Sequence, residues 1–121
     1  MIYLVEDDSS IRELVIYALN STGLEAKGFE KPSEFWKAVE EEEPSLVILD
    51  VMLPEETGID VLKKIRSNPA IEKLPVIMET AKTSEYDRIN GLESGADDYI
   101  SKPFSMMEMV ARVKALIRRS E

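Results

Sequence analysis

Ile2-Tyr3-Leu4-Val5-Glu6-Asp7-Asp8 and Leu46-Val47-Ile48-Leu49-Asp50 share one pattern, a continuous apolar run that stops at acidic residues. Runs of this length are typical of strands that are buried on both faces of a parallel sheet. We therefore predict central strands over residues 2–5 and 46–49.

A helical pattern follows the first run. Ser9 or Ser10 is available as its N-terminal cap, and Gly23 is placed to end it. Residues spaced three and four apart give this helix one apolar face. That predicted face consists of Ile11, Leu14, Val15, Ala18 and Leu19.

Strand and helix patterns then alternate to the end of the sequence. Residues 24–29 alternate between apolar and polar, which is typical of an edge strand. Shorter strands are predicted over 76–78 and 99–100, and helices begin near Pro32, Thr57, Ser84 and Ser105. Five strand–helix repeats predict an α/β fold, a doubly wound parallel sheet with helices on both faces. The expected strand order is 2-1-3-4-5, which makes the first and third strands neighbours.

The composition fits one globular domain of 121 residues with a net charge of −9. Such an acidic balance argues against nucleic-acid binding by this segment, because phosphate contacts need clustered Lys and Arg. The chain has no Cys and no His, so a disulfide framework and a histidine base are excluded. No apolar run approaches the ~20 residues of a membrane span, and no signal peptide is recognisable. We expect a cytoplasmic protein without membrane contact.

Acidic residues from the first and third strands should meet, because ligands of such sheets bind at the carboxyl ends of the strands. Glu6, Asp7 and Asp50 would repel one another there, and a divalent cation would remove that repulsion. Mg²⁺ is favoured because it takes oxygen ligands and shares its shell with phosphoryl groups. Asp8 is either part of this cluster or a cap of the following helix.

Two further strand ends add complementary groups. Thr80-Ala81 offers a hydroxyl and Lys102 an ammonium, although each alone is compatible with an ordinary surface or turn role. Together with a nucleophilic carboxylate and a metal, they form a set suited to phosphoryl transfer.

The whole chain resembles a response-regulator receiver domain, whose architecture is flavodoxin-like with five strands and five helices. The resemblance is carried by several motifs in the correct order. These are Leu4-Val5-Glu6-Asp7-Asp8, Leu49-Asp50-Val51-Met52-Leu53-Pro54, Thr80-Ala81, Gly91-Leu92-Glu93, Gly95 to Ile100 and Lys102-Pro103-Phe104.

The resemblance implies that Asp50 accepts a phosphoryl group from a sensor histidine kinase. Asp7, Asp50 and the backbone carbonyl of Met52 would bind Mg²⁺, with Glu6 acting through water. Lys102 would contact the phosphoryl oxygens, and its bond to Pro103 is expected to be cis. The protein would be a signalling phosphoacceptor rather than an enzyme with an external substrate.

The resemblance also implies a switch. Thr80 and the backbone N–H of Ala81 would contact the phosphoryl group, and Tyr99 would change rotamer in step. For Tyr99, a half-buried edge aromatic is the alternative interpretation.

The end of the chain resembles the OmpR/PhoB-type subfamily, which dimerises through helix 4, strand 5 and helix 5. The implied pairs between copies are Arg88 with Glu108, Asp98 with Arg112, and Glu93 with Lys114. Glu108 and Arg112 are also spaced to pair within one helix. Residues 1–121 would be the receiver domain, and a winged-helix domain, absent here, would bind DNA in a longer protein.

One residue departs from the family pattern. Glu79 occupies a usually aliphatic position on a strand expected to be internal, where an unpaired carboxylate is costly.

Three other protein classes share parts of this pattern. A flavodoxin-like cofactor binder should have a Ser/Thr/Gly-rich loop where this chain has Glu6-Asp7-Asp8, and a haloacid-dehalogenase-type phosphatase should have Asp-x-Asp after its first strand. A receiver fold that acts as an interaction module without phosphorylation is the remaining alternative, although its acidic set should be broken, and here it is intact.

Overall fold

Five parallel strands form one sheet in the order β2-β1-β3-β4-β5 in the computed structural model, which describes residues 1–81, 89 and 94–120. The predicted order is confirmed, with β2 at an edge and β1 beside β3. The strands are β1 (Ile2–Val5), β2 (Ala26–Phe29), β3 (Leu46–Asp50), β4 (Val76–Ala81) and β5 (Asp98–Lys102).

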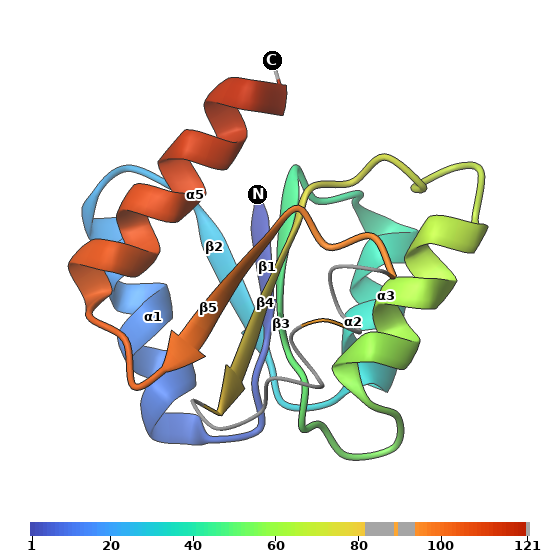
Figure 1. Cartoon of the computed structure of the whole chain (residues 1–121), viewed down its shortest axis with the longest axis horizontal. Helices are drawn as coiled ribbons and strands as arrows, with labels where there is room; N and C mark the ends of the chain where they lie inside the picture. Colours follow the sequence, from blue (N-terminus) through green and yellow to red (C-terminus); the bar gives the residue numbers. More distant parts are fainter. Residues whose placement is uncertain (82–88, 90–93, 121) are drawn as a thin grey trace.

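Helices cover both faces of the sheet, as predicted (Figure 1). Within the described ranges there are four: α1 (Ser9–Ser21), α2 (Pro32–Glu41), α3 (Gly58–Ser67) and α5 (Met106–Ser120). The fourth predicted helix, which was expected to begin near Ser84, lies outside the described residues. None of the helices described is long and apolar enough to cross a membrane.

Two apolar layers sandwich the sheet because successive strand residues point to opposite faces. Tyr3 and Val5 of β1 join the layer under α2 and α3, whereas Ile2 and Leu4 join the layer under α1 and α5. All four residues of β1 and the residues 46–49 of β3 are buried, as their continuous apolar runs predicted, and Asp50 is buried as well.

The helix boundaries correct one prediction. Asp8, not Ser9 or Ser10, caps α1, since its side chain accepts hydrogen bonds from the N–H groups of Ser10 and Ile11. The helix α3 begins at the predicted position, with Thr57 as its cap, and Gly23 ends α1 with φ of +85°, a conformation that glycine adopts without strain.

Two other predictions were inaccurate. β4 continues to Ala81 and β5 runs from Asp98 to Lys102, because backbone pairing carries both strands past their apolar cores. Leu14 was expected to face the core but is 55% exposed. With Ile11, Phe104 and Met106 it lines an open apolar cavity of about 400 Å³ beside β5.

Candidate functional site

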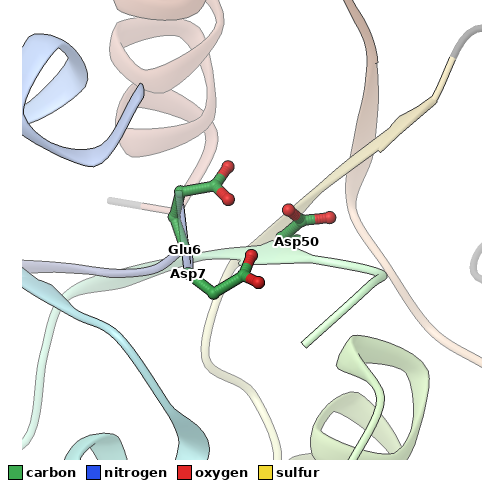
Figure 2. Close-up of side chains that lie close together, drawn as sticks. All are labelled: Glu6, Asp7 and Asp50. Atoms are coloured by element: carbon green, nitrogen blue, oxygen red, sulfur yellow. The ribbon is translucent and has the colours of Figure 1, made fainter. Parts of the chain in front are cut away.

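Three carboxylates meet where β1 and β3 end, as the topology predicted. Val5 is in register with Leu49, so Glu6 and Asp7 emerge beside Asp50. One oxygen from each of the three lies within 4.8 Å of the others (Figure 2). Glu6 and Asp50 are buried, whereas Asp7 is exposed. This set of oxygens fits a hard divalent cation that keeps part of its water shell.

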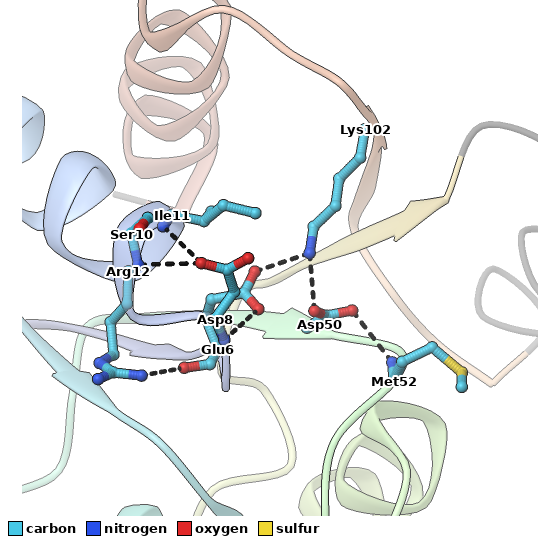
Figure 3. Close-up of polar contacts among 8 residues, drawn as sticks. All are labelled: Glu6, Asp8, Ser10, Ile11, Arg12, Asp50, Met52 and Lys102. Atoms are coloured by element: carbon cyan, nitrogen blue, oxygen red, sulfur yellow. Dashed lines mark hydrogen bonds and ion pairs between the residues drawn. The ribbon is translucent and has the colours of Figure 1, made fainter.

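Lys102 reaches this cluster from the end of β5, as predicted. Its Nζ lies 2.8 Å from Oε1 of Glu6 and 2.8 Å from Oδ2 of Asp50 (Figure 3). Partial burial by itself would lower the pKa of Lys102, but its hydrogen bonds to Asp50 and Glu6 raise that pKa. The ammonium is therefore fixed in its charged form beside the Asp50 carboxylate.

Burial dominates the electrostatics of Glu6. Burial and the neighbouring Asp50 raise the pKa of this carboxyl, the hydrogen bond from the Lys102 ammonium lowers it, and the resulting pKa is about 7. Proton binding at Glu6 and cation binding at the cluster therefore compete near neutral pH.

The backbone between β1 and α1 is held by hydrogen bonds at three points. The N–H of Asp8 donates to Oε2 of Glu6 at 3.2 Å, and Oδ1 of Asp8 accepts from Ser10 at 2.9 Å. Arg12 donates from Nη1 to the backbone carbonyl of Glu6 at 2.7 Å (Figure 3). Asp8 thus acts as a helix cap, the structural alternative that the sequence had left open.

The contact of Arg12 with the backbone of Glu6 was not predicted from the sequence. The feature that could have indicated it is Gly28, because a glycine inside a short strand often marks the close approach of another group. A Cβ at position 28 would lie 2.7 Å from Cγ of Arg12, so glycine leaves room for the arginine to cross β2.

The loop between β3 and α3 packs back against Asp50. Met52, whose carbonyl was expected to bind Mg²⁺, donates its N–H to Oδ1 of Asp50 at 3.0 Å. Gly58 begins α3 against β3, and a Cβ there would overlap the backbone carbonyl of Asp50. Only glycine allows this approach without a backbone shift.

The predicted switch residues lie on β4 and β5. Thr80 is buried at the end of β4, one position beyond the pair formed by Asp50 and Glu79, and Ala81 is exposed beside Lys102. Tyr99 is 6% exposed on β5 and belongs to the apolar layer under α2 and α3. The Lys102–Pro103 peptide bond is cis, as expected.

Glu79 is fully buried on β4, directly in register with Asp50. Its carboxylate oxygens have no hydrogen-bond partner within the part of the chain that the structure describes. Burial and the nearby charge of Glu6 raise its pKa, the charge of Lys102 lowers it, and the resulting pKa is about 8. The departure from the aliphatic pattern therefore places a predominantly protonated carboxyl behind the acidic cluster at neutral pH.

The residues predicted to form a dimer face are only partly described. Arg112 bonds within its own chain to Oδ1 of Asp98 at 2.8 Å and to Oε2 of Glu108 at 3.2 Å, so the alternative pairing inside one helix is present. Lys114 is exposed on α5, whereas Arg88 and Glu93 lie outside the described residues.

The fold and the site together define a class of protein, the doubly wound α/β domain with a carboxylate–lysine site at the carboxyl end of its sheet. The chain belongs to the response regulator receiver domain family, which matches residues 2–114. This confirms the family inferred from the sequence motifs.

Relatives place the chain near transcriptional regulators of the OmpR/PhoB type. It is 48% identical over 120 residues to the transcriptional regulatory protein GltR of Pseudomonas aeruginosa, covering 99% of this chain and 50% of the relative. It is 43% identical over 118 residues to the phosphate regulon transcriptional regulatory protein PhoB of Escherichia coli, covering 98% of this chain and 52% of the relative. The chain thus spans about half the length of these relatives.

The fold agrees with a solved structure of the same kind. The receiver domain of the Francisella response regulator 1452 superposes with a TM-score of 0.90 at 29% identity, covering 99% of this chain and 98% of that one.

Proposed function

We propose that this chain is a phosphoacceptor of two-component signalling in which Asp50 receives a phosphoryl group from a phosphohistidine of a sensor kinase. The observation that carries the proposal is the position of Lys102, whose Nζ lies 2.8 Å from both Asp50 and Glu6 at the end of the sheet. A carboxylate with a charged donor already beside it is suited to attack phosphorus and to hold the transferred group.

The residues present also fit Mg²⁺. Asp7, Asp50 and the carbonyl of Met52 would hold it directly, and Glu6 would hold one of its waters. The bound cation would offset the negative charge that builds up on the phosphoryl oxygens.

The reaction transfers one group between two residues. A carboxylate oxygen of Asp50 forms the new P–O bond as the P–N bond of the phosphohistidine breaks, and the leaving imidazole takes up a proton. Lys102 would then contact the phosphoryl oxygens, with Thr80 and the N–H of Ala81 as further donors.

The proposed output is a change of the surface formed by helix 4, β5 and α5, coupled through Thr80 and Tyr99, that favours a symmetric dimer. In a longer protein this dimer would position a DNA-binding winged-helix domain in the cytoplasm. The names of GltR and PhoB as transcriptional regulators support this output. The phosphorylation-independent interaction module stays the alternative.

Intact-mass spectrometry tests the phosphoacceptor role. After incubation with phosphoramidate and Mg²⁺, the wild-type chain should gain the mass of one phosphoryl group. A chelator should prevent this gain, and Asp50→Asn should lack it. No gain in folded wild-type protein would favour the interaction module instead.

A further inference from the structure

Two consecutive glutamates tie the loop between β3 and α3 to helices outside the acidic cluster. Glu55 accepts two hydrogen bonds from the N-terminal turn of α2: the N–H of Ser33 donates to Oε1 at 2.9 Å, and the hydroxyl of Ser33 donates to Oε2 at 3.0 Å. Both carboxylate oxygens of Glu55 are thus occupied by one residue 22 positions away in the sequence.

Glu56 makes a second attachment. Its Oε2 accepts the indole N–H of Trp36 at 3.0 Å, and its Oε1 lies 2.9 Å from Nζ of Lys64 on α3. The Glu56 side chain is only 17% exposed, so its hydrogen bond to Trp36 is partly shielded from water, whereas Lys64 is 62% exposed and its ion pair is an ordinary surface contact.

The backbone of this loop is strained at Glu55. Glu55 has φ of +69°, a left-handed conformation that few residues other than glycine adopt. Such a conformation persists where surrounding contacts hold it in place. The paired bonds to Ser33 supply that restraint at the same residue.

The same loop carries Met52, three residues before Glu55, and Met52 donates its N–H to Asp50. Any shift of the loop therefore moves the backbone next to the acidic cluster. Partners that orient metal ligands without touching the metal typically change metal affinity by about 10–100-fold when they are removed.

We propose that Glu55 and Glu56 are positioning residues that clamp this loop to α2 and α3 and thereby set the divalent-cation affinity of the Asp7–Asp50 cluster. The inference rests on the proposed function, because it requires the Met52 carbonyl to serve the cation site. Neither glutamate belongs to the acidic cluster of Glu6, Asp7 and Asp50.

Mg²⁺ titration by calorimetry on four forms of the chain tests the clamp. Glu55→Ala should weaken Mg²⁺ binding by about tenfold, the lower end of the range for removed orienting partners. Glu55→Gln should restore near wild-type affinity, because its amide can accept the Ser33 N–H and donate to the Ser33 hydroxyl. Glu25→Ala, at the opposite end of the sheet, matches the loss of one charge and should leave affinity unchanged.

Tryptophan fluorescence tests the second attachment, the hydrogen bond from Trp36 to Glu56. Trp36 is the single tryptophan of the chain, so its emission spectrum monitors the hydrogen bond to Glu56 directly. Glu56→Ala should shift this emission and weaken Mg²⁺ binding together, whereas Glu25→Ala should change neither.

The possible results distinguish a failure of the clamp proposal from a failure of the proposed function on which it rests. If the wild type binds Mg²⁺ and Glu55→Ala binds it equally well, the clamp is wrong even if Glu55→Ala melts at a lower temperature. If Glu55→Gln is as weak as Glu55→Ala, long-range charge rather than loop position sets the affinity, and the clamp is again wrong. If the wild type itself binds no Mg²⁺, the proposed function fails as well.

Discussion

At the scale of single residues, Glu79 is a carboxyl placed where the sheet otherwise buries apolar side chains. Burial raises its pKa from 4.5 to about 8, so the folded chain holds a proton there that the unfolded chain releases above about pH 4.5. Since the folded state binds more protons in this window, stability is fully present below the unfolded pKa and falls as pH rises toward 8.

Glu79→Leu should therefore raise the melting temperature, most strongly above pH 8. Removing a buried carboxyl without a hydrogen-bond partner in the described structure should gain roughly 1–2 kcal/mol, or about 4–8 °C in a domain of this size. Thermal denaturation followed by circular dichroism between pH 5 and 9 measures the difference.

Glu79→Gln serves as the isosteric control, since it keeps the shape and remains neutral at every pH. Its advantage over the wild type should also grow with pH, although the orphaned amide limits the gain. A pH-independent difference between Glu79→Leu and wild type would show that Glu79 does not titrate in this window.

Gly58→Ala should destabilise the chain, because the new Cβ would overlap the backbone carbonyl of Asp50, which cannot move without moving β3. A loss of roughly 1–3 kcal/mol is expected from chemical denaturation. The matched change Gly28→Ala meets the flexible side chain of Arg12 and should cost less. Equal losses in the two variants would contradict the role given to the Asp50 carbonyl.

The burial of Glu79 followed from the sequence, because helices cover both faces of the sheet and the side chains of an internal strand are therefore buried on either face. That no described residue bonds to its carboxylate did not follow, because this depends on whether Lys102 turns toward Glu79 or toward Asp50 and Glu6. Side-chain choices among several nearby carboxylates are set by geometry that no spacing in the sequence encodes.

At the scale of elements, Asp8 determines how α1 begins. Its Oδ1 accepts from Ser10 at 2.9 Å and Ile11 at 3.2 Å. Asp8→Ala should lower the free energy of unfolding by about 1 kcal/mol, whereas Asp8→Asn should retain most of the cap. Urea denaturation measures both, and an equal loss in Asp8→Asn would show that the charge matters rather than the cap.

Element order and type were predictable because hydrophobic periodicity switches clearly between strand and helix. The ends of β4 and β5 were not, since their last residues, Thr80-Ala81 and Ser101-Lys102, do not continue the apolar runs from which the strands were predicted. Pairing with a neighbouring strand supplies the missing stabilisation, and that pairing exists only in the folded sheet.

At the scale of the whole molecule, the proposed dimer requires Arg112 to exchange partners. It now bonds to Asp98 and Glu108 of its own chain, and in the dimer it would bond to Asp98 of a second copy. Arg112→Ala should weaken dimerisation of the beryllofluoride-treated protein by at least about tenfold, or ~1.4 kcal/mol.

Analytical ultracentrifugation measures this change. Lys37→Ala removes one positive charge from an exposed position on α2 and should dimerise like the wild type. Dimerisation by Arg112→Ala as strong as that of the wild type would exclude this residue from the interface.

The convergence of Glu6, Asp7 and Asp50 could be predicted from the sequence, because the order of strands in such a sheet follows from general rules for how strands are connected. The loop attachments through Glu55 and Glu56 could not, since Ser33 and Trp36 belong to a helix whose rotation about its axis is set by core packing. A site at the ends of strands can therefore be predicted from the sheet topology. The contacts that hold the neighbouring loop depend on how the helices pack in the folded structure.

The central claim is that Asp50 carries the phosphoryl group, and mapping the modified residue tests it most directly. Chain treated with phosphoramidate and Mg²⁺ is reduced with borohydride, which converts an aspartyl phosphate to homoserine, and then digested for tandem mass spectrometry. Homoserine should be found at position 50. Homoserine at position 7 instead, or at no aspartate in folded protein that has bound Mg²⁺, would contradict the account.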